Sequence, residues 1–350
     1  MKIAISTIAK NEAHNVKDFV ASCKEADIVS VLDTGSTDDT ISLLKKHNAY
    51  AGQEIIKPFD FAKARNAALD KLPDDVDVVV SIDMDERLQP GWRKALEAIW
   101  QSGVEMVNYQ YVSDFADTDK KIPSVVCWRS KIFQRKGFKW FDRVHELALP
   151  EDKHSPVLVN CDGIVVHHYQ KGERDYTALL TKLIEEDPSQ INSYIQRGAD
   201  YLKLGNYSKG IEDYDKYIEL ARIKRKGCQS QNTADYKLLS GQIAHSFIEI
   251  ARAKMKMKYP VQEVLNCLLM AVSEAPDMRE AWCYLADGWM SVGNYASAYA
   301  AAMNAIKITN PGIYAQELIC WGDLPKNIAS SAFSRVANGV PFENSVNQFK

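Results

Sequence analysis

The chain has 350 residues, which is enough for two domains of ordinary size. Hydrophobic residues make up 46% and charged residues 25%, a mixture typical of a soluble globular protein. The formal net charge of −3 lacks the basic excess of a dedicated nucleic-acid-binding protein, although local basic surfaces are compatible with it.

The cysteines and the N-terminus indicate the compartment. The seven cysteines are odd in number and scattered, and no two form a C-x-x-C pair. They predict neither a disulfide framework nor a zinc site and favour a reducing compartment. The apolar run at the N-terminus is too short for a signal peptide, and no stretch approaches the ~18–20 apolar residues that cross a bilayer. We therefore expect a cytoplasmic protein without a membrane span.

Short β-branched runs alternate with amphipathic helical segments up to about residue 170. In chain order, the expected strands cover 2–8, 28–32, 77–82, 106–112, 125–133 and 164–169. The expected helices cover 12–24, 61–72 and 91–101. This alternation predicts a largely parallel sheet covered by helices. The run DVVVSI at 77–82 has the strongest central-strand pattern in the chain.

Beyond about residue 175, strand patterns vanish and a helical repeat emerges. The segments 193–220 and 281–308 match each other through an aromatic residue, a G-N-Y turn and a second amphipathic helix. That is the tetratricopeptide pattern, which has a period of ~34 residues. The spacing of the two segments is about 20 residues more than two periods, so we expect a degenerate middle repeat with an insertion, the polar run 224–235. An ordinary helical bundle is the alternative.

The chemistry is expected where the strongest strand ends. The first strand is not followed by G-x-G-x-x-G, and the chain has no P-loop motif, so both phosphate cradles are excluded. Asp83 and Asp85 follow the strand as a D-x-D pair, and residues two apart in an extended segment point the same way. Two carboxylates at this edge of the sheet can bind Mg²⁺ or Mn²⁺, and the bound ion can in turn bind a diphosphate. The alternative is a solvated acidic turn.

Four segments in register carry a resemblance to a known family: TIAKNEAHN (7–15), VLDTGSTDDT (31–40), FAKARNAAL (61–69) and SIDMDE (81–86). Together they resemble the family 2 glycosyltransferases of the GT-A fold. RVHE (143–146) and IVVHHY (164–169) resemble the subgroup that carries C-terminal tetratricopeptide repeats. The resemblance implies a GT-A domain over 1–172, with a Rossmann-like, mixed and mostly parallel sheet. An all-α, tetratricopeptide-like domain follows over 173–350.

The resemblance also implies which residues bind the nucleotide. They are Thr7, Ala9, Asp33, Lys63, Arg65 and Asp83. In this family, Asp33 would hydrogen-bond the base, usually uracil, and Asp83 would contact the ribose. Asp33 can also be a simple turn former before Thr-Gly, and Arg65 can be a solvated helix residue.

The metal ligands implied by the resemblance are Asp83, Asp85 and His167. His168 is the rival of His167, because adjacent strand residues face opposite ways. The resemblance places the catalytic base at Glu146, with Asp142 as the runner-up. A buried structural role for Glu146 is the alternative.

The function expected from this resemblance is inverting, Mn²⁺- or Mg²⁺-dependent transfer of a hexose or pentose from a nucleotide sugar, with UDP as the expected nucleotide. The acceptor can be a glycan, a peptide side chain or a modified polymer, including modified DNA. The repeats are expected to bind a partner or to support an oligomer. The basic runs IKRKG (223–227) and KMKMK (254–258) can form a local basic surface, although such runs are more often solvated.

Two other classes compete with this hypothesis. A non-catalytic scaffold would only hold the nucleotide sugar and act through its repeats. A sugar-phosphate nucleotidyltransferase would need a glycine-rich, arginine-bearing loop after the first strand, and TIAKNEAHN provides none.

Overall fold

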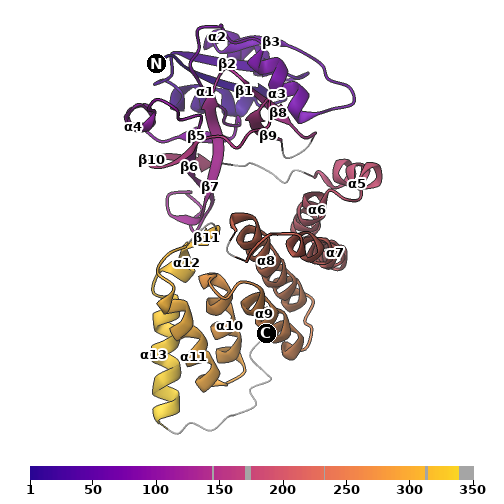
Figure 1. The fold of residues 1–350 in the computed structure, drawn as a ribbon, viewed down its shortest axis with the longest axis vertical. Helices are drawn as coiled ribbons and strands as arrows, with labels where there is room; N and C mark the ends of the chain where they lie inside the picture. The colour runs from indigo at the N-terminus through magenta and orange to yellow at the C-terminus, as the bar shows by residue number, and fades with distance from the viewer. Residues whose placement is uncertain (144–145, 170–174, 232, 312–313, 339–350) are drawn as a thin grey trace. The chain divides into compact units, whose positions relative to one another are not determined.

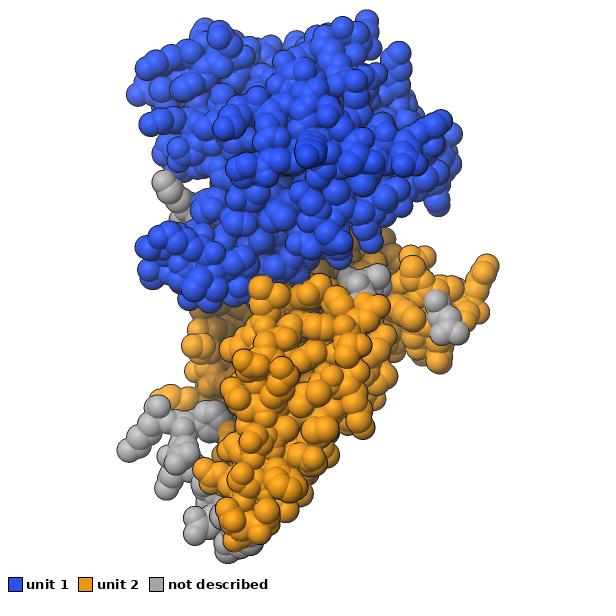
Figure 2. Space-filling view, turned by 90° about the vertical axis from the view of Figure 1, so that its left-hand side faces the viewer, with its two compact units in different colours: residues 1–172 blue, residues 173–350 orange. Residues whose placement is uncertain are grey.

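The computed structural model describes residues 1–143, 146–169, 175–231, 233–311 and 314–338. The chain forms two compact units, Met1–Gly172 and Glu173–Lys350, which Figure 2 shows in blue and orange.

The N-terminal unit is built on a mixed sheet whose eight described strands lie in the order β3-β2-β1-β4-β7-β6-β10-β5. The strands are β1 (Ile3–Ala9), β2 (Ile28–Asp33), β3 (Tyr50–Gln53), β4 (Val78–Val80), β5 (Glu86–Leu88), β6 (Met106–Phe115), β7 (Pro123–Gln134) and β10 (Leu158–His168). A separate hairpin joins β8 (Phe138–Phe141) to β9 (Leu147–Pro150). The helices are α1 (Ala13–Ser22), α2 (Thr40–Lys46), α3 (Phe61–Leu69) and α4 (Trp92–Ile99). The predicted α/β class is confirmed.

The first central strand, β1, is largely apolar because both faces of the sheet are covered. Ile3 and Ile5 of β1 pack into one core, with residues of α1 and α4. Ala4, between them, packs into a second core with residues of α3 and the β8–β9 hairpin. Successive strand residues point to opposite faces, so a strand buried on both sides lacks the polar–apolar alternation of a half-exposed strand.

The strand directions bring distant segments to one edge of the sheet. β1 is parallel to β2 and β4. β7 is antiparallel to both β4 and β6, and β10 is parallel to β6. The carboxyl ends of β1, β2, β4 and β10 therefore lie at the same edge. This edge carries the predicted residues Asp33, Asp83, Asp85 and the two histidines of β10.

The second unit consists of helices that pack against their chain neighbours (Figure 1). They are α5 (Thr177–Glu186), α6 (Ile191–Lys203), α7 (Tyr207–Lys226), α8 (Ala234–Lys256), α9 (Val261–Glu274), α10 (Arg279–Ser291), α11 (Tyr295–Lys307), α12 (Leu318–Trp321) and α13 (Leu324–Ala337), with a short strand, β11 (Gln316–Glu317). In the described part of the chain, no helix combines the length and apolarity that a membrane span requires.

The two matching segments of the sequence form equivalent helix pairs. Gly205 and Gly293 end the first helix of each pair in the left-handed region, with φ of 76° and 73°. The next residue donates its backbone N–H to the Tyr201 carbonyl in one turn, at 2.8 Å, and to the Trp289 carbonyl in the other, at 3.0 Å. Glycine suits this position because it enters the left-handed region at little cost. The predicted tetratricopeptide-like repeat is confirmed.

The middle repeat accommodates its extra residues by lengthening helices. The helices α7 and α8 have 20 and 23 residues, whereas α6, α10 and α11 have 13 each. The beginning of the predicted insertion, 224–226, is the last turn of α7. Lys and Arg have high helix propensity, so this polar run extends the helix instead of ending it.

Candidate active site

Asp33 ends β2 and is completely buried. Its Oδ1 accepts hydrogen bonds from the backbone N–H groups of Gly35 at 2.9 Å and Ser36 at 3.0 Å, and from Nε2 of Gln53 at 2.9 Å. Burial raises the pKa of Asp33, but these hydrogen bonds outweigh it and hold the pKa below its ordinary value. The turn-forming role considered for Asp33 is therefore present, and it engages one oxygen.

The other oxygen of Asp33 has different surroundings. Asp33 Oδ2 is buried and has no hydrogen-bond partner among the described residues, and the same holds for Oγ1 of Thr7. Thr7 pairs with Val31 and Ala9 pairs with Asp33 across β1 and β2, so these four side chains point to the same face. A buried acceptor without a partner costs free energy, which an incoming N–H or O–H donor would relieve.

Arg65 joins two segments that are distant in sequence. It lies on α3 and is 4% exposed. Its Nη2 donates to Oδ1 of Asp83 at 2.6 Å, and its Nε donates to Oε1 of Glu146 at 2.5 Å. The guanidinium also lies 5.0 Å from the centroid of the Trp140 ring. A buried guanidinium requires such partners, so the solvated alternative for Arg65 does not describe its environment.

Asp83 lies between two cations. Lys131 of β7 places Nζ 3.2 Å from Oδ2 of Asp83, on the opposite oxygen from Arg65. Burial raises the pKa of Asp83, but the charges of Arg65 and Lys131 outweigh it and hold that pKa well below its ordinary value. Glu86 supports the same loop, because its Oε2 accepts the backbone N–H of Asp83 at 2.8 Å. We call Lys131, Asp83, Arg65 and Glu146 the four-charge network.

Asp85 faces the second histidine of β10. Oδ2 of Asp85, which is 2% exposed, lies 3.4 Å from Nε2 of His168. The neighbouring His167 contacts the ring of Phe115 edge-on at 5.3 Å, and its Nδ1 lies 3.2 Å from the hydroxyl of Tyr169. Burial lowers the pKa of His167. The structure thus brings His168 beside the D-x-D segment and places His167 among aromatic residues.

The remaining predicted residues differ in their surroundings. Glu146 has a side chain that is only 9% exposed and belongs to the four-charge network. Asp142 is exposed, with a φ of 67°, just after β8. Lys63 is 75% exposed, and its Nζ lies 3.8 Å from Asp60. Of the RVHE motif, Val144 and His145 lie outside the described residues.

The glycosyl transferase family 2 model matches residues 5–150, which contain Asp33, Arg65, Asp83, Asp85 and Glu146. Residues 5–150 are a family 2 glycosyltransferase domain. The repeat domain that follows lies outside this match.

Solved structures also show similarity to the chain. A crystal structure of MamA is 16% identical, covers 47% of this chain and 88% of its own, and has a TM-score of 0.29. The first tetratricopeptide repeat of Spaghetti (RPAP3), bound to the HSP90 peptide SRMEEVD, is 13% identical, covers 43% of this chain and 96% of its own, and has a TM-score of 0.30. The repeat assignment rests on the helix pairs and turns of this chain.

The side chains near the D-x-D segment can be compared with the ligands that Mg²⁺ or Mn²⁺ binds. Among the described residues, no group of three His, Cys, Asp or Glu side chains is placed to hold a metal ion. Asp83 is engaged by two cations, whereas Asp85 and His168 offer an oxygen and a nitrogen 3.4 Å apart. Such ions are often held by one or two protein groups, with substrate phosphates and water completing the shell. Asp85 and His168 fit a site of that kind.

The sequence analysis assigned no role to two residues that contact Asp83, namely Lys131 and Glu86. Lys131 lies in the apolar run VVCWRSKIF (125–133), which was predicted only as a strand. A lysine inside such a strand needs a counter-charge, and that was the available signal. Glu86 directly follows the D-x-D pair, and burial raises its pKa. Nothing in the sequence distinguished it from a solvated acidic residue.

Proposed function

We propose that the glycosyltransferase domain transfers a sugar from a UDP-sugar to an acceptor with inversion, assisted by a divalent metal ion. The observation that carries the proposal is the convergence of Asp33 and the four-charge network at the carboxyl edge of the sheet. Ligands of open α/β sheets bind at that edge. Hydrolysis of a UDP-sugar to UDP would separate this function from a scaffold, which would leave the nucleotide sugar intact.

Asp33 is proposed to select the base. Its buried Oδ2 can accept an N–H from a base edge, and uracil offers one at N3. Thr7 Oγ1, also buried and without a partner among the described residues, is available to a polar group of the nucleoside. Cytosine has no N–H at the equivalent ring position, so this contact favours uridine nucleotides over cytidine nucleotides.

Asp85 and His168 are proposed to hold the metal ion. A divalent ion bound there would neutralise charge on the diphosphate leaving group. Asp83 is then proposed to contact the donor while Arg65 and Lys131 fix its two oxygens. This divides the D-x-D pair into a donor-facing carboxylate and a metal-binding carboxylate.

Glu146 is proposed as the general base. In the inverting step, an acceptor oxygen forms a bond to the anomeric carbon while the bond from that carbon to the UDP oxygen breaks. The acceptor proton moves to Glu146. Arg65 engages Oε1 of Glu146, so Oε2 is the oxygen we assign to the proton. The repeat domain is proposed to contribute to recognition of the acceptor, which can be a glycan, a peptide side chain or a modified polymer.

The nucleotide assignment can be tested by titrating UDP into the full chain in a calorimeter. Asp33→Ala removes the buried acceptor and should weaken UDP binding by about 1–3 kcal/mol, the usual effect of losing one partner of a charged hydrogen bond. Asp39→Ala removes an exposed carboxylate from the same loop and should leave the affinity unchanged. Equal UDP affinity in the wild type and in Asp33→Ala would place the base elsewhere.

The metal assignment can be tested through UDP-sugar turnover. EDTA should abolish turnover, and Mn²⁺ or Mg²⁺ should restore it. Asp85→Asn and His168→Ala should each lower turnover by roughly a hundredfold or more, because a bound ion contributes several kcal/mol at the transition state. His167→Ala is the matched control and should stay close to the wild type. Full turnover in EDTA would refute metal dependence. A loss of turnover in His167→Ala but not in His168→Ala would make His167 the metal ligand.

The role of the base can be tested with Glu146→Gln, which keeps the shape and hydrogen bonding of the side chain but removes its basicity. UDP affinity should persist, and turnover should fall by ~10²–10⁴-fold. Glu151→Gln, at an exposed position after β9, removes an equal charge and should have little effect. Near-normal turnover by Glu146→Gln would transfer the role to Asp142 or another acid.

A further inference from the structure

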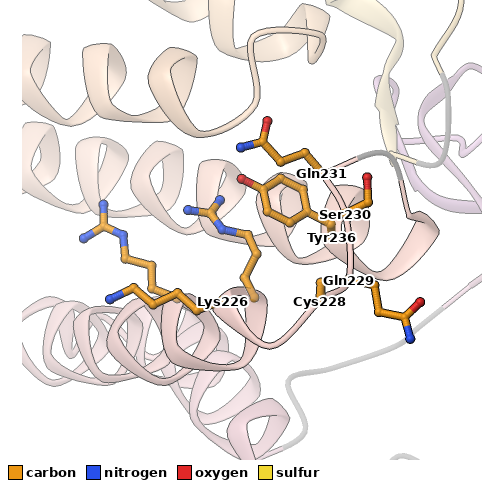
Figure 3. Close-up of a pocket in the computed structure, with 8 residues that line it drawn as sticks. Lys226, Cys228, Gln229, Ser230, Gln231 and Tyr236 are labelled. Atoms are coloured by element: carbon orange, nitrogen blue, oxygen red, sulfur yellow. The ribbon is translucent and has the colours of Figure 1, made fainter.

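A polar pocket lies where α7 ends and α8 begins (Figure 3). Its volume is about 470 Å³, and it is lined by the last two turns of α7, the connection 228–231 and Tyr236 of α8. It occupies the predicted insertion, the segment that departs from the repeat period. The glycosyltransferase function described above uses none of its residues.

Positive charge dominates this pocket. Arg222 and Arg225 lie one helical turn apart and bind the same carboxylate, Glu274 of α9. Arg222 Nε lies 2.9 Å from Oε1 of Glu274, and Arg225 Nη1 lies 2.7 Å from its Oε2. Lys226 adds a third cation, and none of the described residues that line the pocket is Asp or Glu. Three cations against one carboxylate leave an excess of two positive charges.

Basic residues in the last turn of a helix commonly interact with its free carbonyl groups. That explanation does not cover Arg222 and Arg225, whose guanidinium groups are held by α9. The Glu274 side chain is only 9% exposed, so it fixes both arginines at the pocket wall. Arg225 Nη1 also donates to Oγ of Ser240 at 2.9 Å. Each guanidinium has five N–H donors, and these partners do not engage all of them. The arrangement resembles a preorganised anion site more than a solvated helix end.

The other walls complete a polar site. The guanidinium of Arg225 lies 5.2 Å from the ring centroid of Tyr236, which restricts its orientation. Gln229 and Gln231 border the same space and carry amide donors. The second basic run, KMKMK, lies at the far end of α8, about 35 Å away along a helix of 23 residues. The two runs therefore do not form one continuous basic surface, and the pocket stands as a separate site.

We propose that this pocket binds a phosphate group supplied by the acceptor. Guanidinium groups match the planar, two-point geometry of phosphate oxygens, and the excess of two positive charges matches a phosphate monoester. The assignment of the phosphate to the acceptor rests on the proposed glycosyltransferase function. Phosphate binding itself does not depend on it.

The test is calorimetric titration of the full chain with inorganic phosphate, a sugar phosphate and a short phosphodiester oligomer. Arg222→Gln and Lys226→Gln should each weaken phosphate binding by roughly tenfold or more. Glu274 retains Arg225 in the first variant, and Lys226 is exposed, so both should fold. Lys256→Gln removes an exposed charge at the far end of α8 and should bind as the wild type does. If the sugar phosphate binds most tightly, the acceptor is a small phosphorylated molecule. If the oligomer binds most tightly, the acceptor is a polymer.

A variant with the opposite expected effect guards against a merely structural explanation. Glu274→Gln keeps an oxygen that can accept hydrogen bonds from the arginines but removes the one negative charge, so phosphate should bind more tightly. No saturable phosphate binding by the wild type, an equal loss in Lys256→Gln, or equally tight binding of acetate would overturn the proposal. UDP affinity measured in the same samples separates the two hypotheses. If the wild type does not bind UDP, the proposed nucleotide site is refuted, but the phosphate affinities of the variants can still be compared.

Discussion

The buried guanidinium of Arg65 is the group on which the geometry of the candidate active site depends. A charge in the interior needs opposite charges, and Arg65 draws them from Asp83, 18 positions away, and Glu146, 81 positions away. The next residue of α3, Asn66, also joins this helix to β8, because it exchanges two 2.9 Å hydrogen bonds with the backbone of Trp140. The helix α3 therefore locates both the D-x-D segment and the hairpin region that carries Glu146.

The same network gives two neighbouring carboxylates different partners. Asp83 is neutralised by Arg65 and Lys131, whereas Asp85 faces an imidazole. Asp33 divides its own oxygens in a comparable way, with Oδ1 engaged in the turn and Oδ2 buried without a partner among the described residues. In both cases, neighbouring oxygens differ in the partners that the fold gives them.

Much of this arrangement could be predicted from sequence because it follows strong local patterns. The run at 77–82 indicated a central strand, and β4 covers Val78–Val80, so the acidic segment after it could be assigned to the sheet edge. The G-N-Y turns could be matched because glycine in the left-handed region marks both helix ends. The orientations of His167 and His168 could not be predicted, since they depend on the register of β10 against β5 and β6. Lys131 was missed because its pairing with Asp83 is long-range and leaves no local pattern.

The central claim, that Asp83 and Glu146 are coupled through Arg65, is tested most directly by a double-mutant cycle on the free energy of unfolding. Asp83→Asn and Glu146→Gln each leave Arg65 one carboxylate, whereas the double variant leaves the buried guanidinium without either. We expect the loss in the double variant to exceed the sum of the single losses by about 1 kcal/mol or more. Additivity within ~0.3–0.5 kcal/mol would show that the two carboxylates are independent and would contradict the account.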